Sequence, residues 1–284
     1  MKKPDRKSVD RLIQTALNED IGKGDVTTNA IIPPHQKGTA AIYAKESGVI
    51  AGLFVAKDVF KKLDGNSKWK NLVAEGEEVK KGQKVAEVTG NLRALLSGER
   101  TALNFLQRIS GIATAARKFI ETVADTNVKI LDTRKTVPGL RLLDKYGVYA
   151  GGGTNHRFGL YDMALIKDNH IEAAGGIKNA VNRVRKKYGK KYKVEVETTN
   201  LMEVREALDA GADIIMLDNM TISQMKKAVK LINGKCKTEA SGNVDLKRIK
   251  KIATAGVDFI SVGSLTHSVK ALDLSMKISN KKQA

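Results

Sequence analysis

Residues 194–218 read VEVETTNLMEVREALDAGADIIMLD, and this stretch decides the fold. An apolar run that begins at Val194 ends on Glu197, a helix-like segment follows, and a second apolar run that begins at Ile214 ends on Asp218. A strand, a helix and a second strand within this length are typical of one βα unit. The stretch therefore predicts two parallel strands joined by a crossover helix.

The same rhythm extends in both directions along the chain. Short apolar runs that end in polar or small residues recur at intervals of roughly 20 to 35 residues, the size of a βα unit. The six runs span 128–132, 163–167, 194–197, 214–218, 236–241 and 259–263. A doubly wound sheet and a barrel both fit this pattern. We favour an open (β/α) barrel of six or seven parallel strands.

The first hundred residues have a different rhythm. Residues 7–18 have apolar side chains at helical spacing, and 38–56 and 69–89 alternate short strand-like runs with turns. Residues 91–121 predict one long helix, or two helices joined near Ser110. The stretch 73–88 is similar to the hairpin of lipoyl- or biotinyl-type carrier domains, but no Met-Lys tip follows, so we interpret it as part of the fold.

Composition bounds the class of protein. A chain of 284 residues with 42% hydrophobic residues can bury a sizeable core in two domains, and no apolar run is long enough to span a membrane. The single cysteine fits a reducing cytoplasm. The net charge of +19 indicates either a solvated basic surface or a polyanionic ligand. Only 13 of the 50 basic residues are arginine, so the positions of the arginines are informative.

Polar residues gather where the predicted strands end, which is where barrels place their active sites. The strand ends carry Thr133-Arg134-Lys135, Lys167-Asp168, Glu197-Thr198, Asp218-Asn219, Ser241-Gly242-Asn243 and Gly263-Ser264. Any one of these could be an ordinary polar loop. All six together predict one site made of cations, carboxylates and small residues.

Each group suits a different part of an anionic ligand. Arg134, Arg157 and Lys167 can bind carboxylates through charge-assisted hydrogen bonds. Glu197 and Asp218 are hard oxygen donors that suit magnesium. The turns Ser241-Gly242-Asn243 and Val262-Gly263-Ser264 can present backbone N–H groups to phosphate.

A glycine run, Gly151-Gly152-Gly153, leads to His156 and Arg157. It fits neither a Walker loop nor a dinucleotide fingerprint. A histidine alone is more often structural, but its neighbours favour a ligand contact for His156. The four histidines lack zinc spacing, no nucleophile elbow occurs, and one cysteine excludes an iron–sulfur cluster.

At these residues the chain resembles the quinolinate phosphoribosyltransferases. The matching strings run in order along almost the whole chain, without a substitution at the functional positions that match. They are Glu19-Asp20-Ile21-Gly22 to Asp25-Val26-Thr27-Thr28, Gly98 to Asn104, Asp132 to Arg141, Gly152 to Arg157, Ile166 to His170, Glu195 to Glu197, Met216 to Asn219 and Glu239 to Gly242.

The resemblance implies an N-terminal α/β sandwich domain over residues 1–110 and a catalytic α/β barrel over 111–270. It implies that 271–284 return to the first domain as a helix or tail. It also implies a homodimer or homohexamer with shared active sites, in which Arg100 reaches the neighbour's site.

The reaction implied by the resemblance converts quinolinate and phosphoribosyl pyrophosphate to nicotinate mononucleotide, pyrophosphate and CO₂ with Mg²⁺, a step of NAD biosynthesis. Quinolinate would contact Arg100, Arg134, His156, Arg157 and Lys167, and Thr133 would be a further substrate-binding residue. The phosphoribosyl donor would contact Lys135, Lys167, Glu197, Asp218, Ser241, Gly242, Asn243, Val262, Gly263 and Ser264. The catalytic residues would be Lys135, Lys167, Glu197 and Asp218, and the metal ligands would be Glu197 and Asp218.

Three alternatives remain open from the sequence. A paralogue with the same fold could use another acceptor, although Arg134, His156 and Arg157 favour a dicarboxylate. A basic nucleic-acid-binding protein is disfavoured by the 5% aromatic content and the absence of a binding module. A carrier domain is the least favoured of the three. We expect neither a nucleic acid nor a membrane as a partner.

Overall fold

The computed structural model describes residues 4–279, which form two compact units. The first unit takes its residues from the stretch up to Arg117, from 137–152 and from 268 onward, and the second from 118–136 and 153–267. The chain therefore passes between the units four times. No helix in the described part has both the length and the apolar character that crossing a membrane requires.

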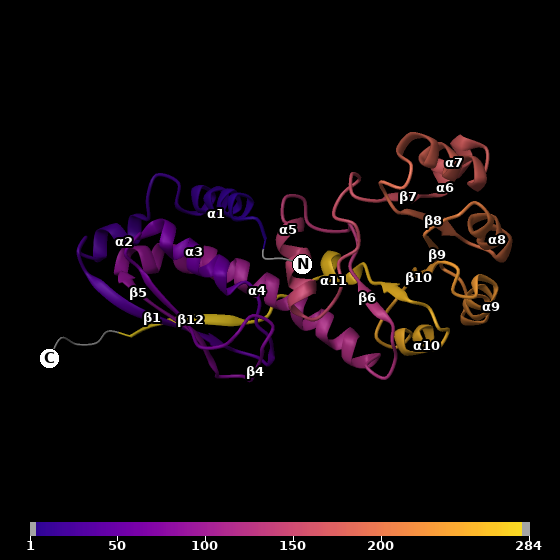
Figure 1. The fold of residues 1–284 in the computed structure, drawn as a ribbon. Coiled ribbons are helices and arrows are strands. Elements are labelled where there is room, and N and C mark those ends of the chain that lie inside the picture. Colours follow the sequence, from indigo (N-terminus) through magenta and orange to yellow (C-terminus); the bar gives the residue numbers. More distant parts are fainter. Residues whose placement is uncertain (1–3, 280–284) are drawn as a thin grey trace. The chain divides into compact units, whose positions relative to one another are not determined.

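The first unit is built on a four-stranded antiparallel sheet with strand order β12-β1-β5-β3 (Figure 1). The strands of this sheet are β1 (Lys37–Ala44), β3 (Lys68–Asn71), β5 (Lys84–Asn91) and β12 (Leu274–Ser279). A small two-stranded sheet pairs β2 (Gly48–Val49) with β4 (Glu78–Val79). Its helices are α1 (Arg6–Ile21), α2 (Val26–Ile31), α3 (Leu53–Leu63), α4 (Leu92–Thr122) and α5 (Arg141–Ala150), of which α4 ends in residues of the second unit.

The first helix shows why these residues fold as they do. Asp5 caps α1 by accepting a hydrogen bond from the Ser8 backbone N–H, and the helix buries Val9, Ile13 and Leu17 at a spacing of four residues. These side chains join a core that also contains Ile42 of β1. The amphipathic pattern predicted for 7–18 therefore forms the expected helix.

Two details of the first unit differ from the sequence-based expectations. Residues 53–56, assigned to a strand-like region, are the first turn of α3, because their apolar side chains continue at helical spacing as far as Phe60. The C-terminal segment, expected as a helix or tail, contains strand β12, which pairs antiparallel with β1. The alternation of buried and less buried residues along Leu274–Ser279 fits a strand. Residues 280–284 of that segment lie outside the described residues.

Six parallel strands form the sheet of the second unit, with order β6-β11-β10-β9-β8-β7. The strands are β6 (Lys129–Leu131), β7 (Ala164–Ile166), β8 (Val194–Thr198), β9 (Ile214–Asp218), β10 (Lys237–Ser241) and β11 (Phe259–Ser261). β6 and β7 are the two edges, so the barrel is open. All six predicted runs form strands, and the α/β fold with an open parallel barrel is confirmed.

Helices cover one side of this curved sheet (Figure 1). They are α6 (Asp168–Ala174), α7 (Ile177–Tyr188), α8 (Leu201–Asp209), α9 (Ile222–Ile232) and α10 (Ile249–Ala253). The short helix α11 (Ser264–His267) follows β11, and its residues Ser264 and His267 line the cavity described below. Along β8, Val194 and Val196 are fully buried on one face. Glu195 and Glu197 share the opposite face, because side chains alternate along a strand. The carboxyl ends of the strands therefore carry polar side chains into the concave side.

Candidate active site

One cavity of about 890 Å³ lies at the carboxyl ends of the parallel strands, and all of its lining residues belong to the second unit. The structure brings together all but two of the predicted site residues there: Thr133, Arg134, Lys135, His156, Arg157, Lys167, Glu197, Asp218, Ser241, Gly242, Asn243, Gly263 and Ser264. Val262 is instead a core residue with 1% exposure. Arg100 is an exposed residue of α4 in the first unit.

Two guanidinium groups, those of Arg134 and Arg157, line the cavity. Arg157 donates one hydrogen bond to the Met163 carbonyl at 3.1 Å, and its buried Nε has no hydrogen-bond partner among residues 4–279. Burial, followed by the charge of Arg134, lowers the pKa of the Arg157 guanidinium. A buried guanidinium with an unsatisfied donor, next to a second guanidinium, forms a site that a bound anion would stabilise.

Two lysines approach the same cavity from different strands. Lys135 follows β6; the Thr133 hydroxyl accepts a hydrogen bond from its backbone N–H, and Thr266 donates to its carbonyl at 2.8 Å. Lys167 precedes α6, where its backbone N–H donates to His170 Nδ1. Both ammonium groups can meet oxyanions in the cavity.

Glu197 and Asp218 are carboxylates at the ends of neighbouring strands β8 and β9. Glu197 Oε2 accepts from Lys167 Nζ at 2.6 Å, and Asp218 Oδ2 accepts from Asn219 Nδ2 at 2.7 Å. In each carboxylate the other oxygen has no hydrogen-bond partner in the described part of the chain. These two oxygens are suitable donors for a hard divalent cation.

The turns after β9 and β10 interlock. Asn219 donates its backbone N–H to the Ser241 carbonyl at 2.9 Å, and its side-chain oxygen accepts from Asn243 Nδ2 at 3.1 Å. Gly242 has φ +94°, and a Cβ built there would lie 2.1 Å from Asn219 Oδ1. Only glycine fits at this position. The absence of a side chain at Gly242 lets the turn Ser241-Gly242-Asn243 line the cavity.

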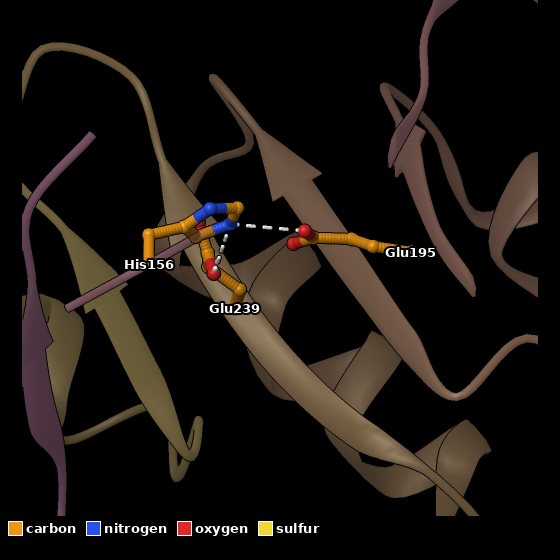
Figure 2. Close-up of side chains that lie close together, drawn as sticks. All are labelled: His156, Glu195 and Glu239. Atoms are coloured by element: carbon orange, nitrogen blue, oxygen red, sulfur yellow. Dashed lines mark hydrogen bonds and ion pairs between the residues drawn. The ribbon is translucent and has the colours of Figure 1, made fainter. Parts of the chain in front are cut away.

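The sequence-based prediction missed a group of buried acids beneath the cavity. Asp132, Glu195 and Glu239 are each 0% exposed, and only Glu239 of the three lines the cavity. Figure 2 shows Nε2 of the His156 ring facing both glutamates, at 2.9 Å from Glu195 Oε2 and 3.5 Å from Glu239 Oε2. Burial, then the charge of Glu195, raises the pKa of Glu239 well above its usual value.

A signal for these acids was present in the sequence. Each one stands two residues before a predicted site residue: Asp132 before Arg134, Glu195 before Glu197 and Glu239 before Ser241. In β8 and β10 this period of two places the earlier residue on the same face, one layer deeper in the barrel. A charged residue inside an otherwise buried strand could have identified them.

Family models match both parts of the chain. The N-terminal domain of quinolinate phosphoribosyl transferase matches residues 25–110, and the C-terminal domain of the same family matches residues 112–277.

Individual relatives and solved structures agree with these matches. A tobacco protein (Nicotiana tabacum) named quinolinate phosphoribosyltransferase [decarboxylating] 2a, mitochondrial, is 47% identical over 94% of this chain and 81% of its own length. A Bacillus subtilis protein named "Probable nicotinate-nucleotide pyrophosphorylase [carboxylating]" is 46% identical over 94% of this chain and 92% of its own. The crystal structure of NadC from Streptococcus pyogenes superposes with a TM-score of 0.95 at 42% identity, covering 98% of this chain and 99% of that one. The chain therefore belongs to the quinolinate phosphoribosyltransferase family.

Proposed function

We propose that the protein transfers the phosphoribosyl group of phosphoribosyl pyrophosphate to quinolinate and releases pyrophosphate and CO₂, giving nicotinate mononucleotide for NAD biosynthesis. The observation that carries this proposal is that one cavity is lined by two arginines, two lysines, two carboxylates and two small-residue turns. The family relatives and their printed names support the same reaction.

In this proposal quinolinate binds at the arginines. Its two carboxylates are planar anions, and the forked guanidiniums of Arg134 and Arg157 can each pair with such a group through two parallel hydrogen bonds. The buried and unsatisfied Nε of Arg157 supports this assignment, because a bound carboxylate would supply the missing acceptor.

The donor binds at the other part of the cavity. Phosphate oxygens can accept from the backbone N–H groups of the 241–243 and 263–264 turns and from the ammonium group of Lys135. A Cβ at Gly263 would lie 3.2 Å from Lys135 Cδ, so the glycine leaves room for the lysine side chain to pass. These contacts favour a ligand with several phosphate groups.

Magnesium fits the donor part of the cavity. Glu197 and Asp218 each offer a carboxylate oxygen, and Mg²⁺ in phosphate sites commonly takes one or two carboxylates together with water and substrate phosphates. When bound, the ion would neutralise charge on the departing pyrophosphate.

The residues of the chain account for the remaining chemistry. Displacement at the anomeric carbon passes through an oxocarbenium-like state, whose positive charge Glu197 and Asp218 can stabilise. Lys135 and Lys167 stabilise negative charge on the leaving group and on the acceptor. Loss of the ring carboxylate as CO₂ leaves an electron pair on the carbon beside the ring nitrogen, which is cationic after ribosylation. A proton from solvent then completes nicotinate mononucleotide. The site therefore acts mostly by positioning and electrostatics.

The reaction is tested by mixing the purified protein with quinolinate, phosphoribosyl pyrophosphate and MgCl₂ and following both quinolinate loss and nicotinate mononucleotide formation. We expect turnover only when all three are present, and we expect EDTA to abolish it and added Mg²⁺ to restore it. Turnover that persists in EDTA would contradict the metal assignment. Binding of quinolinate without turnover would contradict the donor assignment, and no binding of quinolinate would favour a paralogue with another acceptor.

We further propose a homo-oligomer in which Arg100 completes the active site of a neighbouring subunit. Arg100→Ala and Lys135→Ala are each expected to be inactive alone. When the two variants are co-expressed and purified together, activity should return, because a mixed dimer contains one site with neither substitution. Activity that stays absent in the mixed oligomer, while each variant still assembles, would contradict sharing of the site.

We also propose a cytoplasmic location, supported by the presence of only one cysteine in the chain. Names of plant relatives specify mitochondria or chloroplasts, so the location is best tested by fractionation of the source cells and immunodetection.

A further inference from the structure

Both ring nitrogens of His156 are directed at protein groups rather than left for a ligand. Nδ1 accepts a hydrogen bond from the Arg157 backbone N–H at 2.8 Å, so Nδ1 carries a lone pair and the ring hydrogen resides on Nε2. Nε2 then donates to Glu195 Oε2 at 2.9 Å (Figure 2). In this arrangement neither nitrogen is available to a carboxylate of quinolinate.

From this geometry we infer that His156 is a positioning residue, which Glu195 and Glu239 hold in place so that it aligns Arg157 for quinolinate. The inference rests on the proposed function for the identity of the ligand. It assigns a role to two acids that the proposed reaction does not use, and it removes His156 from the direct quinolinate contacts implied by the family resemblance.

The acids form one layer of the barrel interior. Glu195 comes from β8 and Glu239 from β10, the strands on either side of β9, and Asp132 follows β6 two strands beyond β10. Alternate strands fill one layer of such barrels. His156 contacts each member, because its backbone N–H also donates to Asp132 Oδ1 at 2.8 Å. The segment that carries Arg157 is therefore attached to the layer through both backbone and ring.

Glu195 and Glu239 approach each other around the His156 ring, with the ligand atoms of the three side chains within 4.8 Å of one another. Glu239 is faced by Glu195, by Asp132, by the Ser261 hydroxyl of β11 and by the His156 ring, and both of its carboxyl oxygens are buried without a hydrogen-bond partner among residues 4–279. Burial, followed by the charge of Glu195, raises the pKa of Glu239 well above its usual value, which favours the neutral form of this acid. Glu195 remains the acceptor for the His156 ring.

The same three side chains could hold a metal ion by distance alone, because their ligand atoms lie within 4.8 Å of one another. A metal on Nε2 would need the lone pair of that nitrogen and would move the ring hydrogen to Nδ1. Metal-bound histidines usually donate that other N–H to an acceptor. Here Nδ1 faces the Arg157 N–H, which is itself a donor, so the arrangement favours a proton over a metal.

Three variants test the positioning role by kinetics. Glu195→Ala removes the acceptor of the His156 ring and is expected to raise the KM for quinolinate by about tenfold or more, with the KM for phosphoribosyl pyrophosphate within about threefold of wild type. Glu195→Gln keeps an oxygen acceptor, and Glu239→Gln mimics the protonated acid, so both should stay within about threefold of wild type for both substrates. A Glu195→Ala variant with unchanged quinolinate KM, or a Glu239→Gln variant as impaired as Glu195→Ala, would overturn the inference.

The ring itself is tested by NMR of wild-type protein labelled with ¹⁵N-histidine, with the His156 signals assigned by comparison with His156→Gln. We expect the Nε2–H tautomer, unchanged when Zn²⁺ alone is added and unchanged when quinolinate is added at saturation. An Nδ1–H tautomer, loss of Nε2–H with Zn²⁺, or a new hydrogen bond to Nδ1 with quinolinate would each overturn it. The tautomer is measured without substrate, and quinolinate binding is measured separately by calorimetry. A failure of the proposed function can therefore be distinguished from a failure of the positioning role of His156.

Discussion

Replacing Arg134 with alanine should raise the KM for quinolinate by more than about 100-fold, because two charge-assisted hydrogen bonds at about 1.5 kcal/mol each would be lost. Arg134 lines the cavity beside Arg157, and its charge already contributes to lowering the pKa of Arg157. Binding of the phosphoribosyl donor depends on other residues, so its KM should stay within about threefold of wild type. Steady-state kinetics with each substrate varied at saturating levels of the other provides the measurement.

The matched control is Arg183→Ala, which removes an equally long cation from an exposed position on α7. This variant should match wild type for both substrates. If Arg134→Ala raised the KM of both substrates equally, Arg134 would act on the whole site and its assignment to quinolinate would be wrong. If Arg183→Ala reproduced the effect, the loss would come from net charge rather than from a contact.

The second large effect is expected from Gly242→Ala, which should lower kcat/KM by more than about 100-fold, since a shift of about 1 Å at a positioned site can cost that much. Its φ of +94° disfavours any side chain, and the new Cβ would lie 2.1 Å from Asn219 Oδ1. Asn219 must then move, and with it the hydrogen bonds to Asp218 and Asn243. Kinetics together with thermal unfolding would separate the effect on the site from the effect on stability.

Gly211→Ala is the matched control for backbone strain. Gly211 has φ +78° in the same unit, and a Cβ built there meets nothing within 4 Å. It should lower the melting temperature by a strain of about 1–2 kcal/mol while leaving kcat/KM near wild type. Equal losses of activity in both variants would show that strain alone, and not the contact with Asn219, explains the result.

Local patterns were sufficient for the strands and for the residues at their ends. The central parallel strands β8 and β9 are mostly buried, so apolar residues recur along them, and the polar residue at the end marks the carboxyl end. Parallel strands bring those ends to one edge, which is why the sequence alone is enough to group Arg134, Lys167, Glu197 and Asp218. The one residue of a predicted phosphate turn that the cavity excludes, Val262, has its side chain in the core.

The depth of each polar residue in the barrel was harder to predict from the sequence than the strand face on which it lies. Glu195 and Glu239 lie one layer below Glu197 and Ser241, and the strand pattern alone did not separate a buried acid from one at the rim. The C-terminal segment was also harder to assign, because β12 is stabilised by pairing with β1, more than two hundred residues earlier in the chain. The charge inside β8 and β10 was a local signal, but the depth of each acid and the pairing of β12 depend on contacts between distant segments.

By itself, the sequence determined the alternation of strands and helices, the family, and the set of polar residues at the carboxyl ends of the strands, since all of these depend on neighbours along the chain. The tertiary structure decided which partners those residues have. It placed Glu195 and Glu239 beside the His156 ring and Asp132 beside the His156 backbone N–H. It also directed both ring nitrogens of that histidine at protein groups. The physical reason is that hydrogen-bond partners and burial arise from contacts between distant segments, which no local periodicity encodes.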